Sequence, residues 1–514
     1  MPVSITFPPG DTPVLYVHPA KQGVAFASAE NAGRSYGVIP VGVAALVNLL
    51  RENGIAVRGI DYPLEKQLNP RFSLKNWLGA HRGVRVILID MHWYEHTYGA
   101  VDFARACKAA MPWAYTVLGG LTASGFSRAI LEQCPEVDFV VRGDAERPLL
   151  ALVQKILAGR RVVDTALLSD IPNLSYRHHG QIVENPLGYT ASVENLDQLN
   201  FVDIDFLEHA QHYSVHEYLV TDLASARQAL NAEKPFAGRW LCTARGCRYH
   251  CSYCGGSKDA HKLLAARDGV IVRSPERIAD DLVRLQSQGV DQAAMSYDIA
   301  ELGEAYWQTL FAHMQARRID IGIYNEFFQQ PDAEFIHALA RVAGNRHTCV
   351  AVSPLSGNER VRRLNGKHYS NALFWQTLTL LRQYNFYLYV YFSLNLPGET
   401  DETFSETLGL AKKVYDFYPH HLLKILNTVH TIDPLAPMNV HPEKYGIASS
   451  MTSFADFYTY CRDTQVASPE ARTGKHRGFE FKDPQRRSLA RMAQAWDAAW
   501  KGREESWWPI PPSW

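Results

Sequence analysis

The stretch CTARGCRYHCSYCGG occupies residues 242–256 and holds four of the eight cysteines in the chain. Its last three cysteines follow the spacing Cys247-x3-Cys251-x2-Cys254. Three thiols within eight residues are an improbable group of core residues, and in a chain with no disulfide pattern they indicate metal or redox chemistry. The cysteines outside this stretch stand far apart and are predicted to be buried, reduced thiols: Cys107, Cys134, Cys349 and Cys461.

Two kinds of metal site fit this spacing. A structural zinc site uses four ligands, usually in two pairs, and Cys242 or His250 is available as the fourth although the chain has no second CxxC pair. A four-iron cluster held by three thiolates leaves one iron open, and an open iron can bind and activate a small molecule. The spacing alone leaves both interpretations open, and the strand position of Cys242 favours the core for that residue.

Short apolar runs alternate with helical patterns over the first 160 residues. Such runs predict strands that are buried on both faces of a parallel sheet. They lie at residues 14–17, 84–89, 116–120 and 137–143, with a weaker run at 56–61. Helical patterns lie at residues 41–53, 101–111, 125–133 and 147–158, and Gly54 is expected to end the first of these helices. The alternation predicts a doubly wound, Rossmann-like α/β sheet with ligands at the carboxyl ends of its strands.

A second alternation begins near Arg239. Its apolar runs lie at residues 239–243, 292–298, 321–327, 348–354, 387–394 and 422–429. Six βα units predict a partial (β/α) barrel with its function at the carboxyl ends of the strands. Before it, residues 173–186 predict a β-hairpin that turns at His179-Gly180. We therefore expect four parts: an α/β domain over residues 1–165, a connector over 166–235, a barrel over 236–434 and a small, mostly helical domain over 435–514.

The composition is that of a globular protein, with 46% hydrophobic and 20% charged residues. Because 52 basic residues face 53 acidic ones, we do not expect nucleic acid or an anionic membrane as the main partner. The most apolar run, residues 37–50, is too short to span a membrane and contains Pro40. The N-terminus MPVSITFPPG lacks a basic start and an apolar core, so we expect no signal peptide and a cytoplasmic protein.

The motif CxxxCxYC at the end of the first barrel strand resembles that of the radical S-adenosylmethionine (SAM) superfamily. The resemblance implies that Cys247, Cys251 and Cys254 ligate a [4Fe–4S] cluster and that the amino and carboxylate groups of SAM bind its open iron. It further implies that one electron from the cluster cleaves SAM to a 5′-deoxyadenosyl radical. Tyr253 then packs near the adenine, and Cys242 is not a ligand.

Longer segments resemble the cobalamin-binding (B12-binding) branch of this superfamily, from residue 12 to about residue 430. SLNLPGETDETFSETL at residues 393–408 resembles the segment after the fifth barrel strand of that branch. SPLSGNERVRRLNGKHYS at residues 353–370 resembles the segment after the fourth strand, although Ser353-Pro354 replaces the usual glutamate-serine start. VLYVHPAK, VLGGLTA and VDFVVRGDAERPLL resemble strand ends of a flavodoxin-like cobalamin domain, which implies cobalamin as a third cofactor.

The candidate ligand-binding residues are those at the predicted strand ends. For SAM they are Tyr253, Gly256, Asp298, Asn325, Glu326 and Ser353. For cobalamin they are His18, Tyr36, Met91, His92, Gly119, Gly120, Leu121, Thr122, Gly143 and Glu146. The segment DMHWYEH, residues 90–96, departs from the cobalt-binding DxHxxG signature because Glu95 stands at the glycine position. We therefore expect His92 to line the corrin site without being an axial ligand of cobalt, and we assign no catalytic residue.

The resemblance implies a methyltransferase that moves a methyl group from SAM, via methylcobalamin, to an unactivated carbon of a small molecule such as a natural-product intermediate. It also implies an electron donor such as flavodoxin or ferredoxin. One alternative keeps the cofactors and performs a non-methylating reaction, such as cyclisation, ring contraction or carbon–carbon bond formation. Others are a non-enzymatic cobalamin or iron–sulfur sensor and a zinc-bound binding protein.

Overall fold

The computed structural model describes residues 11–25, 27, 38–159, 163–214, 237–344, 347–465, 478–483 and 489–506. Contacts divide the chain into two compact units. The first unit comprises Met1–Tyr213, Lys258–Gly269 and Met451–Ala467, and the second comprises Ser214–Ser257, Val270–Ser450 and Ser468–Trp514. Two segments distant in sequence from the N-terminal domain therefore belong to the same unit as that domain.

A seven-stranded sheet with the order β2-β1-β3-β4-β5-β6-β7 forms the centre of the first unit. Its strands are β1(Val14–His18), β2(Val57–Asp61), β3(Val86–Asp90), β4(Tyr115–Gly119), β5(Phe139–Val141), β6(Leu174–His178) and β7(Gln181–Glu184). Strands β1 to β5 pair in parallel, and β6 and β7 form an antiparallel hairpin at one edge. The five predicted strands and the predicted hairpin are confirmed. The hairpin, which was expected in a connector, is part of this sheet because β6 pairs with β5.

The first unit also contains helices. They are α2(Gly42–Glu52), α3(Tyr62–Leu68), α4(Leu74–Gly79), α5(Thr97–Ala110), α6(Leu121–Gly125), α7(Ser127–Gln133), α8(Glu146–Ala158), α9(Val193–Asp197), α11(Lys258–Ala265) and α19(Phe454–Thr464), with the 3-10 turns η1(Tyr94–His96), η2(Thr165–Leu168) and η3(Ala210–His212). The helix expected over residues 125–133 is broken at Phe126, whose φ of −117° and ψ of 19° are not helical. Its ring instead packs against Phe454 and Phe457 of α19.

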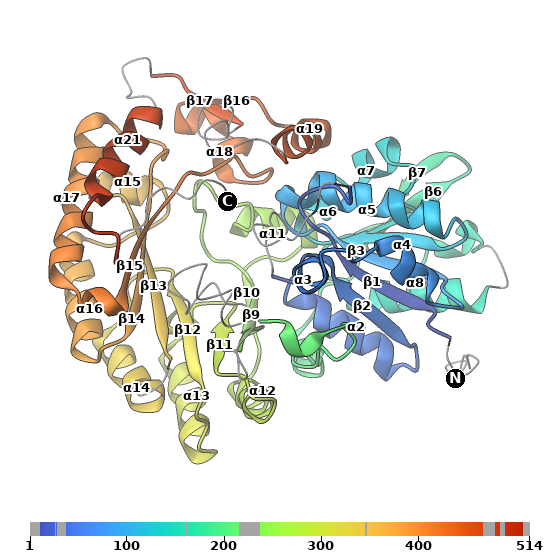
Figure 1. Ribbon diagram of the computed structural model, residues 1–514, viewed down its shortest axis with the longest axis horizontal. Coiled ribbons are helices and arrows are strands. Elements are labelled where there is room, and N and C mark those ends of the chain that lie inside the picture. Colours follow the sequence, from blue (N-terminus) through green and yellow to red (C-terminus); the bar gives the residue numbers. More distant parts are fainter. Residues whose placement is uncertain are drawn as a thin grey trace. The chain divides into compact units, whose positions relative to one another are not determined.

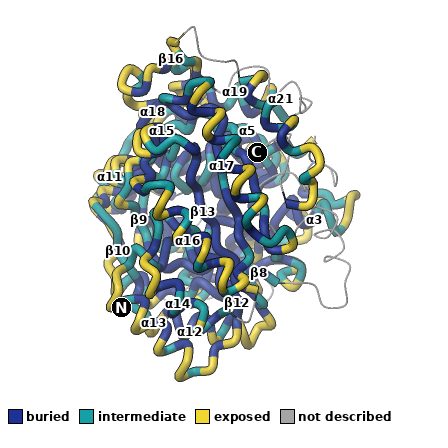
Figure 2. Tube along the Cα trace, turned by 90° about the vertical axis from the view of Figure 1, so that its left-hand side faces the viewer, coloured by how far each residue is buried: buried dark blue, intermediate teal, exposed yellow. Residues whose placement is uncertain are grey.

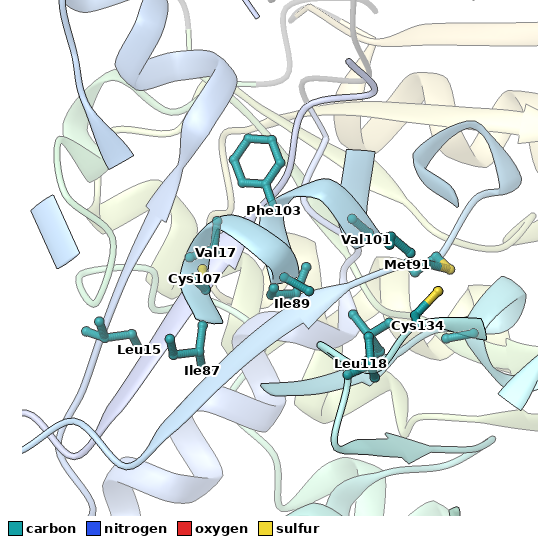
Figure 3. Close-up of a cluster of buried hydrophobic side chains, with 14 of the residues drawn as sticks. Leu15, Val17, Ile87, Ile89, Met91, Val101, Phe103, Cys107, Leu118 and Cys134 are labelled. Atoms are coloured by element: carbon teal, nitrogen blue, oxygen red, sulfur yellow. The ribbon is translucent and has the colours of Figure 1, made fainter. Parts of the chain in front are cut away.

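The core of the first unit follows from the alternation along its parallel strands. Leu15 and Val17 of β1 point to the same face of the sheet as Ile87 and Ile89 of β3, and α5 covers them with side chains such as Phe103 (Figure 3). All five residues of β1 and of β3 are buried, so the opposite face is covered as well. Burial on both faces explains why these strands read as continuous apolar runs.

A six-stranded sheet with the order β8-β11-β12-β13-β14-β15 forms the second unit, and every pair in it is parallel. The strands are β8(Gly238–Leu241), β11(Gln292–Met295), β12(Gly322–Phe327), β13(Cys349–Leu355), β14(Tyr387–Ser393) and β15(Leu423–Thr428). All six confirm the predicted runs, and chain order equals spatial order, as a partial (β/α) barrel requires. The short antiparallel pairs β9(Ala244–Gly246) with β10(Val270–Val272) and β16(Ile447–Ser449) with β17(Phe479–Phe481) were not predicted, because three residues carry no periodic signal.

Helices follow the strands of this sheet. They are α12(Pro275–Ser287), α13(Glu304–Ala316), α14(Ala333–Ala343), α15(Glu359–Leu364), α16(Asn371–Gln383), α17(Asp401–Phe417), α18(Pro437–Val440) and α21(Leu489–Trp500), with the 3-10 turns η5(Ala300–Leu302), η6(His420–Leu422) and η7(Pro442–Tyr445). Figure 1 shows α13, α14, α16 and α17 along the outer side of strands β12 to β15. The residues of these strands are mostly buried, whereas α12 and α13 each expose the residues on one side of the helix (Figure 2).

The C-terminal part of the chain is divided between the two units. Phe454 of α19 lies in the core of the first unit, and the thiol of Cys461 donates to the carbonyl oxygen of Tyr94 over 3.3 Å. Trp496 of α21 is fully buried in the second unit, 5.8 Å from the ring of Phe392. The described residues after position 435 therefore contribute to two cores, which differs from the small separate domain that the sequence suggested. Among all described residues, no helix combines the length and the apolarity that crossing a membrane requires.

A buried polar cluster lies where the strand order of the first sheet reverses, between β1 and β3. His18 Nδ1 lies 2.9 Å from Asp90 Oδ1, and the Tyr16 hydroxyl donates to the same oxygen over 2.8 Å. The ring of His96 stands 5.5 Å from the ring of His18 and is fully buried. Among the described residues, neither nitrogen of His96 has a hydrogen-bond partner. Burial, together with the charge of His18, lowers the pKa of His96 well below its usual value.

Replacement of His96 by Phe is expected to make the protein less sensitive to acid. Because the folded pKa lies below the unfolded value of about 6.5, the unfolded state binds the proton first as pH falls. Stability is therefore full above about pH 6.5 and is lost below it, by at most about 1.4 kcal/mol per pH unit. Thermal unfolding at pH 7.5 and pH 5.5 measures this loss. His96→Phe and His96→Gln should both reduce the difference between the two midpoints, and an unchanged difference would contradict the assignment.

Candidate functional site

The three clustered cysteines lie between β9 and α11. Cys247, Cys251 and Cys254 are partly exposed, whereas the five other cysteines of the chain are buried. The Tyr249 amide donates to Cys247 Sγ over 3.4 Å, and the Cys254 amide donates to the Cys251 carbonyl oxygen over 3.1 Å. These two bonds link neighbouring residues within the loop. Cys242, which follows β8, is 3% exposed, as its predicted place in the core requires.

The three thiols are close enough to influence one another's ionisation. Burial raises the pKa of each, and the charge of Cys247 raises the pKa of Cys251 further. The Lys367 ammonium opposes this effect at both Cys247 and Cys251. Lys367 is itself 4% exposed and donates to the Phe328 carbonyl oxygen over 2.9 Å. A buried cation beside thiolates favours their charged, metal-binding form.

This arrangement fits a cluster held by three thiolates. In the part of the chain that the structure describes, no three His, Cys, Asp or Glu side chains converge as ligands of a single metal ion. A four-iron cluster does not need such convergence, because each cysteine binds a different iron. The partly exposed thiols, the neighbouring cation and the loop at the carboxyl end of β8 together provide what such a cluster needs.

Tyr253 packs between apolar side chains and an imidazole. Its ring stacks on His430, with 4.4 Å between centroids and an interplanar angle of 21°, and it contacts the buried group of Leu355, Val361 and Leu396. His430 is fixed in turn, because its Nε2 lies 2.9 Å from the Ser393 hydroxyl. Sequence analysis missed His430 and Lys367, although His430 directly follows the predicted strand run 422–429 and Lys367 lies within the segment 353–370.

Two of the predicted SAM-binding residues, Asp298 and Asn325, are engaged with their own loops. Asp298 accepts from Asn325 Nδ2 over 2.9 Å, from the Phe328 amide over 2.8 Å and from the Ala300 amide over 3.1 Å. Asn325 Oδ1 accepts from the Ile299 amide over 3.0 Å. Both side chains are 1% exposed or less. They join the loops after β11 and β12, so the structure assigns them to scaffolding; burial raises the pKa of Asp298 to about 7 despite its donors.

Glu326 and Ser353 form the other pair of predicted strand-end residues. The Ser353 hydroxyl donates to Glu326 Oε1 over 3.2 Å, and Glu326 is half-buried. Its carboxylate acts electrostatically on Cys251 and Tyr253, where it raises both pKa values after the larger effects of burial and of nearer charges. The charge of Glu326 is therefore coupled electrostatically to the cysteine loop. Gly256 is part of the loop itself, and a Cβ there would stand 3.8 Å from Cys254 Sγ.

The strand ends of the first unit separate into accessible and buried residues. His92, Gly119, Gly120, Leu121 and Gly143 are half-buried at the carboxyl edge of the sheet. The buried ones among the predicted cobalamin-binding residues are His18, Met91, Thr122 and Glu146. Tyr36 lies outside the described residues.

Met91, Thr122 and His18 are already committed to the protein's own packing. Met91 is fully buried in the hydrophobic core of the first unit (Figure 3), and its contact with cobalamin stays a prediction. The Thr122 hydroxyl donates to the His92 carbonyl oxygen over 3.0 Å. His18 is bonded to Asp90 and is fully buried. These three side chains are buried and support the accessible residues at the strand ends.

Two of the strand-end glycines serve a different contact from the one expected. A Cβ at Gly120, whose φ is +114°, would stand 2.6 Å from the Cα atom of His92. A Cβ at Gly143, whose φ is +60°, would stand 2.8 Å from the Cα atom of Ala265 in α11. Both glycines therefore allow close approach of protein backbone. At Gly119 the nearest atom to a Cβ would be the Val141 carbonyl oxygen at 3.7 Å, which is ordinary van der Waals contact.

Part of the chain matches a known protein family, and two curated proteins resemble it in sequence. Residues 241–411 match the family model described as the Radical SAM superfamily. The chain is 24% identical over 332 residues to the anaerobic magnesium-protoporphyrin IX monomethyl ester cyclase of Cereibacter sphaeroides, covering 63% of this chain and 48% of the cyclase. It is 24% identical over 253 residues to the hopanoid C-3 methylase of Methylococcus capsulatus, covering 49% and 41%. The chain thus spans about half the length of these curated relatives.

A solved structure resembles nearly the whole chain. TsrM, a radical S-adenosylmethionine methyltransferase from Kitasatospora setae whose structure contains tryptophan substrate and a SAM analog, superposes with a TM-score of 0.63 at 18% identity. The match covers 95% of this chain and 88% of TsrM. A second TsrM structure, with cobalamin and a [4Fe-4S] cluster bound, gives a TM-score of 0.61 at 17% identity. At this identity the likeness shows the shared fold alone.

Replacement of Asp298 by Ala is expected to destabilise the second unit by about 3 kcal/mol, because it leaves three buried donors without their acceptor. Urea unfolding of the cofactor-free protein measures the change. Asp332→Ala is the control, since Asp332 is exposed and makes no side-chain bond at the start of α14, and its effect should stay within about 0.5 kcal/mol. Equal effects of the two variants would contradict a scaffolding role for Asp298.

Proposed function

We propose that the chain, whose residues 241–411 match the Radical SAM superfamily model, is a cobalamin-dependent C-methyltransferase acting on a small molecule. The observation that carries this proposal is the combination of two sites on one chain. One is the loop of partly exposed thiols at the carboxyl end of β8. The other is the accessible strand-end edge of a doubly wound sheet, the place where such sheets bind cofactors. Neither a zinc-bound binding protein nor a sensor needs both.

The residues of the second unit receive roles from their geometry. Cys247, Cys251 and Cys254 would hold the [4Fe–4S] cluster. Tyr253 would pack beside the adenine of SAM, and the ring of Tyr253 is itself stacked on His430. Glu326, oriented by the Ser353 hydroxyl, presents a carboxylate toward the same space as the thiols. When bound, the cluster supplies the electron that cleaves SAM, and cobalamin carries the methyl group.

In the first unit, we assign the contacts with cobalamin to Gly119, Leu121 and His92. Gly119 ends β4, Leu121 begins α6 two residues later, and His92 lies on the loop after β3. His92 keeps the neutral form there, because burial lowers its pKa to about 4. The carboxyl edge of the sheet thus offers glycine backbone, an apolar side chain and an uncharged imidazole to a large planar ring.

The three known proteins that resemble this chain support different outcomes for the substrate. The hopanoid methylase and TsrM carry methyltransferase names, whereas the magnesium-protoporphyrin relative is a cyclase. Cyclisation with the same cofactors is therefore the second candidate. Methylation is preferred because the methyltransferase TsrM matches 95% of this chain. The expected partners are a small-molecule substrate and a low-potential electron donor.

The cluster assignment predicts a sharp contrast between cysteines. Cys247→Ala, Cys251→Ala and Cys254→Ala should each abolish the bound cluster, because a thiolate ligand is lost. Cys242→Ala should retain it, since that thiol is buried and its Sγ donates to the Ala244 carbonyl oxygen at 3.8 Å. Iron, sulfide and zinc analysis after anaerobic reconstitution provides the measurement. Iron loss in Cys242→Ala, or zinc without iron in the wild type, would refute the assignment.

The reaction class is tested by anaerobic incubation with cobalamin, SAM and a low-potential reductant. Mass spectrometry should detect 5′-deoxyadenosine and S-adenosylhomocysteine, one reporting radical formation and the other methyl transfer. Deoxyadenosine without S-adenosylhomocysteine would favour the cyclase-like alternative. Neither product from protein with an intact cluster would favour the sensor.

A further inference from the structure

We propose that Asn365 and Gly366, at the end of α15, are positioning residues that hold the cysteine loop in the geometry that binds the cluster. This inference rests on the proposed function, because it concerns the same loop. Neither residue has a group that reaches substrate chemistry. Their role follows from what each contacts within the second unit.

Asn365 joins the cysteine loop to two other segments. It is fully buried, and its Oδ1 is hydrogen-bonded to the hydroxyl of Ser252, which lies between Cys251 and Cys254. Its Nδ2 donates to the Val361 carbonyl oxygen over 2.8 Å and to the Pro397 carbonyl oxygen over 3.0 Å. One amide side chain thus connects the loop, helix α15 and the LPGET segment. Since Ser252 is also fully buried, both partners are shielded from competing water.

Gly366 contacts the cluster ligand directly. Its φ is +95°, and a Cβ at this position would stand 2.8 Å from both the Cα atom and the Sγ atom of Cys251. Any larger residue therefore displaces Cys251 or itself. The Gly366 carbonyl oxygen is held by Gln329 Nε2 over 3.0 Å, so the glycine is not free to retreat. The cysteine that binds iron rests against a fixed stretch of backbone.

A buried arginine anchors this platform. The Arg362 guanidinium is fully buried and donates to the carbonyl oxygens of Pro354, Tyr369 and Ser356 over 3.1, 3.2 and 2.8 Å. The Lys367 amide in turn donates to the Arg362 carbonyl oxygen over 3.1 Å. The hydrogen bonds of Arg362 therefore hold the segment that carries Asn365 and Gly366 in one conformation. Because the cysteine loop packs against this segment, its thiols are preorganised.

The test compares two glycines that differ in one respect. Gly366 and Gly269 both have a φ of +95°, but nothing lies within 4 Å of a Cβ built at Gly269. Gly366→Ala and Gly269→Ala therefore carry the same backbone strain, and only Gly366→Ala meets Cys251. Full-length protein is reconstituted anaerobically with iron and sulfide. The readouts are iron content, the EPR spectrum of the reduced cluster and the rate of iron loss to a chelator, none of which depends on turnover.

The expected results are specific. Gly366→Ala should lose iron about 10-fold faster than the wild type and shift the EPR spectrum, whereas Gly269→Ala should match the wild type in both. Thermal unfolding of the cofactor-free variants measures folding separately. Equal iron retention in Gly366→Ala and the wild type would overturn the inference. Equal loss in both alanine variants would overturn it too, because strain alone would then be the cause.

Milder variants test the hydrogen bond of Asn365. Ser252→Ala should accelerate iron loss, Asn365→Ala should accelerate it more, and the double variant should behave like Asn365→Ala alone, because both act through one contact. Additive effects would overturn the proposed coupling. Failure of the wild type to take up a cluster would instead refute the proposed function. A wild type with a stable cluster but no SAM cleavage would refute that function and leave the positioning roles intact.

Discussion

The contact between the cysteine loop and residues 365–367 governs the arrangement of the second unit's site. A loop with three thiols at the end of a short strand has little secondary structure of its own. Its geometry therefore comes from what it rests on, and here that is the buried amide of Asn365 and the bare backbone of Gly366. Lys367, next in sequence, adds a buried positive charge to the same surface. Residues 365–367 thus both support the cysteine loop and place a positive charge beside its thiols.

Further interactions extend this support to the neighbouring strand ends. Ser356, after β13, donates to Glu399 of the LPGET segment over 3.3 Å, and Thr407 of α17 donates to the same carboxylate. Lys367 binds the Phe328 carbonyl oxygen while the Phe328 amide binds Asp298. The two segments that resemble family motifs are therefore parts of one hydrogen-bonded frame. Their glycines and prolines shape this frame, and Glu326 is a half-buried strand-end carboxylate whose charge acts on Cys251.

The first unit follows a related rule with a different outcome. Its strand-end loops are packed so closely on one another that Gly120 and Gly143 are needed for backbone contacts within the unit. Asp90, His18 and Tyr16 form a buried hydrogen-bonded group beneath the edge. Among the described residues of this edge, Gly119, Leu121 and His92 are partly accessible and uncharged. We propose that they contact the ring of a cofactor.

The sequence by itself determined the strands, the two parallel sheets and the cysteine motif. Apolar runs buried on both faces carry their own signal, and the thiol spacing is local, so neither needs knowledge of distant contacts. Only the tertiary structure decided which polar strand ends are free. Asp298 and Glu326 both lie at the ends of predicted strands in the sequence. In the structure the Asp298 carboxylate accepts three hydrogen bonds within the protein, whereas Glu326 is half-buried. Likewise, Gly366 and Gly269 differ only in whether another backbone lies beside them, and such long-range packing leaves no periodic trace in the chain.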